Sequence, residues 1–373
     1  MEPTPSPYTM KINVDETLPD GQSENYKAND DLSNAPSYVQ QLFHIDGVKG
    51  LYRVVDFIAL ERHPRVSWEE ILPEVRNVLG SDEETTELFS KAVQSEEPAF
   101  GEVKVLIQMI RNIPTQVKLI EGDEEKRFAL PERFMNVAMR AAEASNNYLM
   151  ERTWVEQAPR YGDIDEIGNE VVEELSATYS KERLEELLQL ALKEDAPKEV
   201  RKREKVTVEM LDHSDWRERY KVLDKIVDPT KEDYPVLNKA LDDEHSSVRR
   251  LATAYLGMIE DKETLPYLYK ALKDKSVNVR RTAGDCLSDL GYKEAIPKMI
   301  ECLSDKSRIV RWRAAMFLYE VGDESTIPAL EKALDDPEFE VRMQAKMALA
   351  RIQGGKEAEG SIWQQMAEIT KEK

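Results

Sequence analysis

The 373-residue sequence predicts α+β N-terminal modules followed by an all-α solenoid of helical hairpins. Three observations support this fold class. Several positions in the C-terminal half recur with a period of 31, each period contains two blocks of helical apolar spacing, and the N-terminal half contains runs that alternate like β-strands. A hairpin of two short helices cannot bury its apolar face alone, so successive copies are expected to stack.

The repeat is clearest from about Tyr234 to Ile352. In each copy a proline stands in the first turn of the first helix, helix A, where its missing N–H costs little. The second helix, helix B, carries a Val-Arg-x-x-Ala pattern. Two polar ladders keep the same step, at Asp243, Asp274, Asp305 and Asp336 and at Arg249, Arg280, Arg311 and Arg342. A degenerate leading copy is expected from near Val206, with Trp216 aligned to Val248 at an offset of 32.

This pattern resembles the HEAT-like repeats first noted in phycobiliprotein lyases. The helix-A proline, the aspartate before the turn and the Val-Arg-x-x-Ala motif of that family stand in each of the four copies. The resemblance implies a HEAT-like (ARM-type) solenoid. It also implies that the two ladders tie the turn of one repeat to its neighbour, so we interpret both ladders as structural.

One stripe of helix B is expected to point away from the repeat core, if Val248 marks the core direction at about 100° per residue. We define the helix-B stripe as Arg250, Arg281, Arg308, Trp312, Tyr319, Phe339, Met343 and Lys346. Helix B lines the concave side of HEAT-type solenoids, and this composition is typical of protein interfaces, so the stripe is a candidate protein-binding site. Three other interpretations stay open: Trp312 or Phe339 packs between repeats, the segment around Trp363 covers the stripe, or the chain's own acidic front half occupies it.

The first module is predicted to be a small α+β domain. Its elements are strands at Tyr8–Val14, Val48–Val54 and Asp56–Leu60 and helices at Ser37–Ile45 and Trp68–Leu79. It resembles the N-terminal domain of Nfu-type iron–sulfur scaffold proteins. A Thr-Pro-x-Pro-x-x-Met-Lys motif is matched by Thr4, Pro5, Pro7, Met10 and Lys11, and a Leu-Phe-x-Ile-x-Gly-Val segment by residues 42–48.

This resemblance implies docking on iron–sulfur assembly or recipient proteins. In Nfu scaffolds, however, a Cys-x-x-C in a separate domain holds the cluster. The cysteines of this chain, Cys286 and Cys302, are too far apart in the sequence to form that motif, and cluster ligation normally takes four thiolates. We therefore expect two buried small hydrophobic residues, no cofactor, and a docking role without a cluster.

The middle module is also predicted to be α+β. Its strands are expected at Glu102–Met109, Thr115–Ile120, Arg127–Leu130 and Trp154–Gln157, with a turn at residues 112–114 and helices at Glu132–Leu149, from Asp163 onward and at Lys181–Leu192. The order of the modules is similar to the bacterial family called conserved virulence factor C, which implies a link to virulence regulation but no reaction. The expected domains are residues 1–90, 95–200 and 206–352, the last with about five repeats, and a tail or helix at 353–373.

Charge and motifs narrow the function. The chain has 52 basic and 73 acidic residues, a net charge of −21 and a pI near 4.8, which argues against nucleic-acid binding. Residues 207–352 carry a net charge of only −4 and residues 1–206 carry −16, so the acidity lies in the front modules. The sequence contains neither an apolar run long enough to span a membrane nor the pattern of a signal peptide, so we expect a cytoplasmic protein.

The candidate chemistry is weak. His44, His63, His213 and His245 have no metal-ligand spacing, and phosphate-binding and nucleophile motifs do not occur. We expect a non-catalytic scaffold that binds protein partners, with no catalytic, cofactor or metal residues. The oligomeric state stays open. The alternative is a HEAT-fold enzyme, lyase-like or DNA-glycosylase-like, that uses the concave groove.

Overall fold

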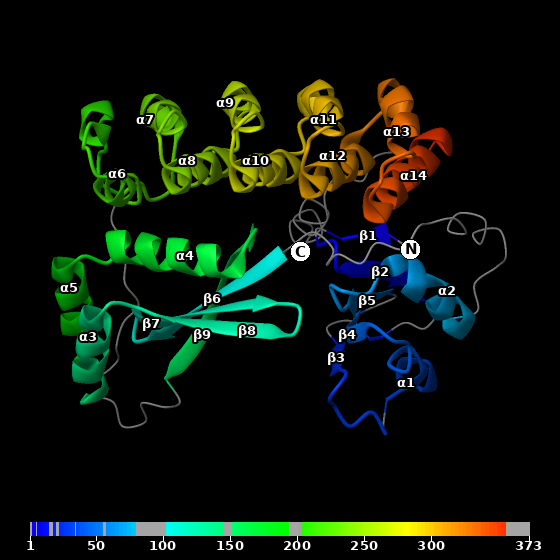
Figure 1. Ribbon diagram of the computed structural model, residues 1–373, viewed down its shortest axis with the longest axis horizontal. Coiled ribbons are helices and arrows are strands. Elements are labelled where there is room, and N and C mark those ends of the chain that lie inside the picture. The colour runs from blue at the N-terminus through cyan, green and yellow to red at the C-terminus, as the bar shows by residue number, and fades with distance from the viewer. Residues whose placement is uncertain are drawn as a thin grey trace. The chain divides into compact units, whose positions relative to one another are not determined.

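The computed structural model describes residues 2–355 apart from 5, 15–17, 20–21, 34, 55–56, 80–101, 145–150, 194–200 and 202. The chain divides into two compact units. Unit 1 combines Met1–Phe100 with Gly291–Lys373, and unit 2 is Gly101–Leu290. Each unit therefore contains one front module and part of the repeats (Figure 1). Most of the expected tail at 353–373, including Trp363, lies outside the described residues.

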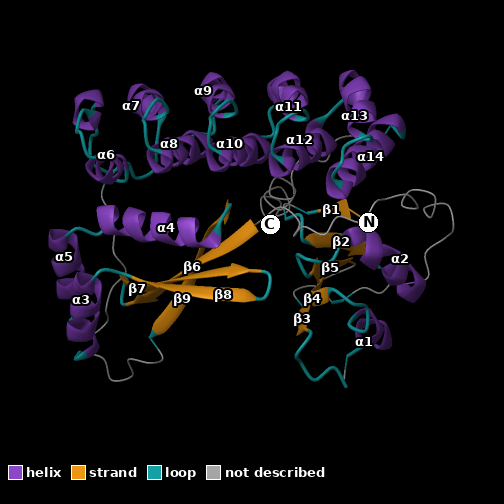
Figure 2. Cartoon of the chain, viewed as in Figure 1, coloured by secondary structure: helices purple, strands orange, loops and turns teal. Residues whose placement is uncertain are grey.

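The first module is a five-stranded antiparallel sheet in the order β1-β2-β5-β4-β3, with two helices (Figure 2). Its elements are β1 (Glu2–Pro3), β2 (Thr9–Asn13), β3 (Ser23–Lys27), α1 (Ser37–Leu42), β4 (Val48–Val54), β5 (Phe57–Arg62) and α2 (Trp68–Leu79). Every second residue of β5 is buried, as expected for a strand with one face toward a core. Strand β3 escaped prediction because its sequence, Ser-Glu-Asn-Tyr-Lys, lacks the apolar alternation of a half-buried strand.

The middle module is a four-stranded antiparallel sheet in the order β8-β7-β6-β9, with three helices packed on its apolar core. Its elements are β6 (Glu102–Ile110), β7 (Ile113–Glu121), β8 (Glu124–Ala129), α3 (Glu132–Ala142), β9 (Arg152–Tyr161), α4 (Ile164–Thr178) and α5 (Lys181–Ala191). The expected turn at residues 112–114 is shifted. Arg111 and Asn112 form the turn, both with positive φ as in a type I′ hairpin, and Pro114 lies within β7 at a register shift.

The repeats are helical hairpins. Unit 2 contains a 3-10 turn (Val208–Leu211), α6 (Trp216–Leu223), α7 (Tyr234–Ala240), α8 (Ser246–Met258), α9 (Leu265–Ala271) and α10 (Val277–Leu290), and unit 1 contains α11 (Ile296–Cys302), α12 (Arg308–Val321), α13 (Ile327–Ala333) and α14 (Phe339–Gln353). Each of α7, α9, α11 and α13 has its proline in the first turn. Neighbouring B helices pack together, α8 on α10 and α12 on α14.

The polar ladders tie the hairpins together. Arg249 donates through Nε and Nη2 to the two carboxylate oxygens of Asp274, at 2.6 and 2.9 Å, and through Nη1 to the backbone carbonyl of Asp243 at 2.8 Å. The backbone N–H of Ser276 donates to Asp274 at 2.7 Å, which holds the turn before α10. Arg249 therefore connects its own turn to the turn of the following repeat. In unit 1, Arg311 and Asp336 make the same two-fold contact.

The leading repeat joins this ladder through Arg219 of α6. Arg219 donates to the carbonyl of His213 at 2.7 Å and to Asp243 at 2.6 Å. It therefore occupies the ladder position that Arg249 holds in the next repeat, which gives an offset of 30, so the expected offset of 32 is wrong. Helix α6 has only eight residues, so it offers few apolar positions by which to align it with the other B helices. The contacts of Arg219 provide that alignment.

Candidate functional site

The helix-B stripe is largely covered, which corrects the expectation that it lines an open groove. Arg281, Trp312 and Met343 are buried, with 4%, 2% and 6% of their surface exposed. The other five members are partly buried: Arg250, Arg308, Tyr319, Phe339 and Lys346. In each unit the front module contacts the stripe, through Arg250 in unit 2 and through Met343 in unit 1.

In unit 2 a buried carboxylate joins the middle module to the repeats. Glu174 of α4 accepts from Arg160 of β9 at 2.7 Å and from Arg250 of α8 at 3.1 Å. Burial raises the pKa of Glu174, but Arg250 and Arg160 outweigh it and hold that pKa at about 2. The carboxylate is therefore ionised at neutral pH and balanced by two guanidinium groups. One turn earlier, Glu170 accepts from the hydroxyl of Ser247 at 2.7 Å.

A second contact lies at the start of α10. The side chain of Asn278 accepts from the backbone N–H of Tyr161 at 2.9 Å and donates to its carbonyl at 3.2 Å. The guanidinium of Arg281 lies 5.5 Å from the Tyr161 ring centre, and the Tyr161 hydroxyl is 3.1 Å from Glu102. Burial raises the pKa of Glu102, and Arg281 offsets part of that effect. The stripe residues of unit 2 are therefore used in contacts with the middle module.

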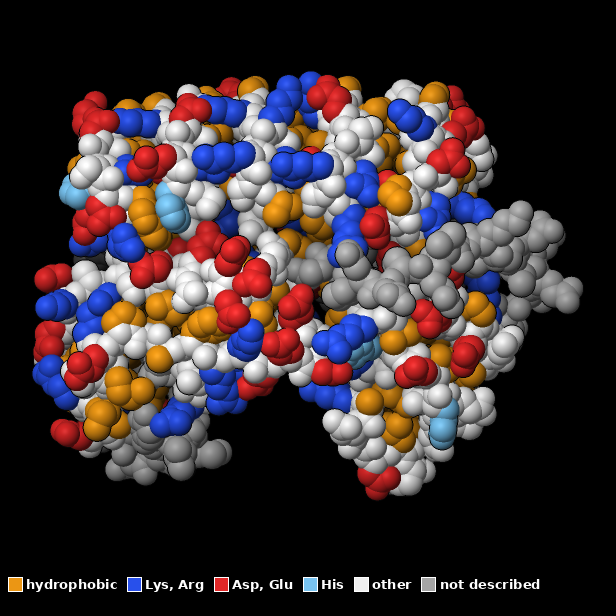
Figure 3. All heavy atoms as spheres, viewed as in Figure 1, with side chains coloured by type: hydrophobic (Ala, Val, Ile, Leu, Met, Phe, Trp, Pro, Cys, Tyr) orange, Lys and Arg blue, Asp and Glu red, His pale blue; other side chains and the backbone are white. Residues whose placement is uncertain are grey.

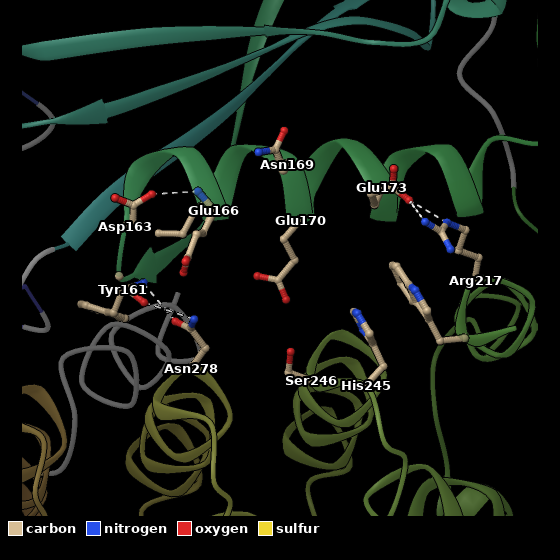
Figure 4. Close-up of a pocket in the computed structure, with 13 residues that line it drawn as sticks. Tyr161, Asp163, Glu166, Asn169, Glu170, Glu173, Arg217, His245, Ser246 and Asn278 are labelled. Carbon is tan, nitrogen blue, oxygen red and sulfur yellow. Dashed lines mark hydrogen bonds and ion pairs between the residues drawn. The ribbon is translucent and has the colours of Figure 1, made fainter.

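Beside these contacts lies an open cleft of about 480 Å³ between α4 and the N-terminal ends of α6, α8 and α10. Figure 4 shows Glu166, Glu170 and Glu173 projecting from α4 toward Ser246, His245 and Arg217. Acidic side chains gather on this face of the molecule along α4 (Figure 3). Glu173 accepts from Arg217 Nε at 2.6 Å.

The repeat side of the cleft carries a stacked ring pair. The ring centres of Trp216 and His245 are 3.7 Å apart, with the ring planes 1° from parallel. Burial lowers the pKa of His245, which favours the neutral imidazole at neutral pH. The cleft therefore has carboxylates on one wall and a flat aromatic surface on the other.

In unit 1 the contact between the front module and the repeats is apolar with one buried ion pair. Phe339, Met343 and Met347 of α14 pack on the core of the first module. Arg62 of β5 donates to Glu340 at 2.9 Å, and neither side chain is more than 6% exposed. Burial lowers the pKa of Arg62, and Glu340 opposes this shift.

The remaining features concern the cysteines and the potential metal ligands among the residues that the structure covers. Cys286 and Cys302 are both buried. Among the residues the structure describes, no group of three or more His, Cys, Asp and Glu side chains is placed to hold a metal ion. Within the same residues, no helix has the length and apolar character needed to cross a bilayer.

The sequence did not reveal the carboxylates of α4 as site residues. Glu170, Glu173 and Glu174 stand three and four residues apart, so they share one face of a helix, and this spacing was a usable signal. It carried little weight in a chain with 73 acidic residues. The cleft residues Trp216, Arg217 and Asn278 had no signal, because only the fold brings them opposite α4.

Family models match all three parts of the chain. A model described as the N-terminal part of scaffold protein Nfu/NifU matches residues 1–85, one described as virulence factor matches 108–188, and one for HEAT repeats matches 204–281, 234–316 and 265–350. The fold and these matches define a HEAT-repeat protein with an Nfu-type N-terminal module and a virulence-factor module. They confirm the fold class and the resemblances found in the sequence.

Two curated relatives show which family within this class the chain belongs to. Over 263 residues the chain is 54% identical to YpgR of Bacillus subtilis, covering 70% of this chain and 68% of the relative. Over 264 residues it is 42% identical to conserved virulence factor C of Staphylococcus saprophyticus, covering 70% and 69%. The chain belongs to the conserved virulence factor C family. A crystal structure of computationally designed armadillo repeat proteins aligns with 58% of this chain and 98% of the designed chain, at 16% identity and a TM-score of 0.31.

Proposed function

We propose that this protein is a non-catalytic adaptor whose helix-B stripe is a protein-docking surface. The observation that carries the proposal is the ion pair between Glu174 of helix α4 and Arg250 of the stripe, at 3.1 Å. A segment from outside the repeats thus binds the B helices through side-chain contacts, as a partner segment would. The stripe has the aromatic and arginine-rich composition of interface centres, and the front modules are its occupants within the chain.

The proposal assigns the partners by module. The Nfu-type module is the part that docks on iron–sulfur assembly or recipient proteins, supported by the family match over residues 1–85. The link to virulence regulation is supported by the name of the staphylococcal relatives. The site of action in this proposal is the cytoplasm. Linking two docking modules in one chain raises the effective concentration of one partner near the other.

The structure favours an adaptor over an enzyme that uses the helix-B groove. A glycosylase-like or lyase-like groove would need Arg250, Arg281 and Trp312 at an open face. Arg250 is instead paired with Glu174, and Arg281 and Trp312 are buried. The group that Arg250 holds in this structure is a protein carboxylate, which supports a protein segment over a duplex or a chromophore as the ligand of this surface.

Affinity purification from the native bacterium tests the proposal. A tagged full-length chain, expressed from its own locus, should recover the same protein partners in repeated mass-spectrometry experiments, including iron–sulfur assembly or recipient proteins. Recovery of nothing above a tag-only control would reject the adaptor. Partners without iron–sulfur proteins, together with unchanged cluster-enzyme activities after gene deletion, would remove the iron–sulfur link. A metal or chromophore that co-purifies in stoichiometric amount would favour the enzyme.

A further inference from the structure

We propose that helix α4 is a releasable latch on the first repeats, and that the surface beneath it takes an acidic helical segment of a partner protein. The inference rests on the proposed adaptor function and names the kind of partner. We define the latch as Glu170, Glu173 and Glu174 of α4, and the latch surface as Arg217, Ser247 and Arg250 of α6 and α8.

The latch has the form of a helical ligand. Its three carboxylates stand three and four residues apart on one helix face. Glu173 pairs with Arg217, Glu170 with Ser247, and Glu174 with Arg250. A helix from another protein that carried carboxylates at this spacing would make the same contacts, because the surface contributes the donors and the helix contributes only acceptors.

The repeats continue this pattern beyond the latch. Arg217, Arg250 and Arg281 place one arginine on each of the three successive B helices of unit 2. Arg281 pairs with Asp285 of its own helix and lies 5.5 Å from the ring centre of Tyr161, whose hydroxyl donates to the buried Glu102. The middle module therefore places a carboxylate near this arginine as well. Arg250 and Arg281 stand at equivalent repeat positions, and Arg217 stands at the position of Ser247. An arginine on each of three neighbouring helices suits an acidic partner, and the acidic character of the present occupant supports that choice.

The two front modules are attached by different chemistry, which indicates that α4 can be released. Both attachments contain a buried ion pair, Arg62–Glu340 in unit 1 and Glu174–Arg250 in unit 2. The apolar core of the first module also includes a repeat residue, Met343 of α14. The apolar core of the middle module includes no repeat residue within the described parts of the chain. Instead, polar side chains make the latch contacts, and a cleft of about 480 Å³ adjoins them.

The outermost latch contact is weak. The side chains of Glu173 and Arg217 are 43% and 45% exposed, and exposed ion pairs are screened by salt. Polar interfaces within a chain allow the domains to move relative to one another unless the interface is large and apolar. The hold of the latch therefore depends on Glu170 and Glu174, and an acidic competitor that engages the same donors can replace it.

A peptide-binding experiment with purified full-length protein tests the latch. The probe is a fluorescein-labelled peptide of residues 163–178, the sequence of α4 itself, and the control peptide carries Gln in place of the three latch glutamates. The host proteins are the unchanged chain, the latch variant Glu170→Gln/Glu173→Gln, and a matched variant, Glu182→Gln/Glu185→Gln, on helix α5. Fluorescence anisotropy measures the affinity of each pair.

Opening the latch should raise the affinity for the probe about tenfold, because a larger fraction of molecules then presents the surface. The matched variant should bind like the unchanged chain, the Gln peptide should bind at least tenfold more weakly, and Arg217→Ala/Arg250→Ala added to the latch variant should abolish binding. Equal affinity of the latch variant and the unchanged chain would overturn the proposal. Equal binding of both peptides would overturn it too, and so would tighter binding of a DNA oligonucleotide to the same surface.

If the latch variant loses its helical circular dichroism, Glu170→Gln alone takes its place, since it weakens the contact with Ser247 and leaves the buried Glu174 ion pairs intact. Hydrogen exchange of the α4 amides then supplies the second measurement. Added probe should speed exchange in α4, and unchanged exchange would count against the latch. These measurements use purified protein, so they test the release of α4 whether or not the cellular purification recovers a partner. The two proposals can therefore fail separately.

Discussion

Arg62 and Glu340 form a buried ion pair at 2.9 Å between strand β5 and helix α14, although 278 residues separate them. The guanidinium also lies 5.2 and 5.6 Å from the ring centres of Tyr8 and Trp68, and it donates to the carbonyl of Val66. A charge in this position needs its partner, because water cannot reach it. The last repeat therefore completes the first module.

Removing this partner should destabilise unit 1. Glu340→Ala leaves the Arg62 charge buried without a counter-ion, which costs about 3–5 kcal/mol. Glu338→Ala is the matched control, because Glu338 pairs with Arg308 at 3.7 Å with both side chains 25% exposed, and such pairs contribute below about 1 kcal/mol. Urea unfolding, monitored by tryptophan fluorescence, measures the free energy of unfolding of both variants. Equal losses in the two variants would show that the Arg62–Glu340 pair is not a stabilising tie.

The Glu174 cluster predicts a specific pH dependence. The pKa of Glu174 is about 2 in the folded protein, below its ordinary value of 4.5, so its ionised form stabilises the fold above pH 4.5 and this contribution disappears as the pH falls toward 2. The difference in melting temperature between the unchanged chain and Glu174→Gln should therefore be largest near neutral pH and shrink on acidification. Melting curves at a series of pH values measure it.

A control separates this effect from general acid unfolding. Glu186→Gln changes an exposed carboxylate of α5, and its small effect on melting should not follow the course of Glu174→Gln with pH. If the difference in melting temperature between the unchanged chain and Glu174→Gln stays constant or grows on acidification, Glu174 is not an ionised partner of Arg160 and Arg250.

Local patterns in the sequence predicted most of the fold. The helix at Trp68–Leu79 and the strand at Val48–Val54 have the predicted bounds, because each combines a clear period with turn or cap residues. The two-residue turn at Arg111 and Asn112 was misplaced by a neighbouring proline. Strand β3 forms because β4 pairs with it, and no local pattern encodes that pairing.

The candidate site was only half predictable. Helical geometry places Arg250 and Met343 on the side of helix B that meets other groups, but it cannot say what meets them. The contacts Glu174–Arg250 and Arg62–Glu340 join residues 76 and 278 positions apart. Spacing within one helix carries no information on which module packs against which repeat, so exposure was predicted where the chain's own modules provide cover.

The ladders predict that an aspartate within a ladder contributes more to folding stability than an exposed aspartate outside it. Asp274→Ala removes the two-fold partner of Arg249 and the acceptor for the N–H of Ser276, and should cost about 3–5 kcal/mol because Arg249 is only 4% exposed. Asp242→Ala removes an exposed partner of Lys270 and should cost below about 1 kcal/mol. Chemical denaturation of both variants measures the difference, and similar midpoints would reject a structural ladder.

The close packing of α8 on α10 predicts the sign of a glycine substitution. A Cβ added at Gly257 would lie 2.6 Å from the Cβ of Cys286 and would meet its sulfur, so the two helices would have to separate. Helix propensity alone favours Gly→Ala by about 1 kcal/mol, whereas overpacking costs about 1–3 kcal/mol. Gly257→Ala should therefore lower the melting temperature, and Cys286→Ala added to it should restore part of the loss by removing the sulfur. A rise in melting temperature for Gly257→Ala would show that α8 and α10 are not packed this closely.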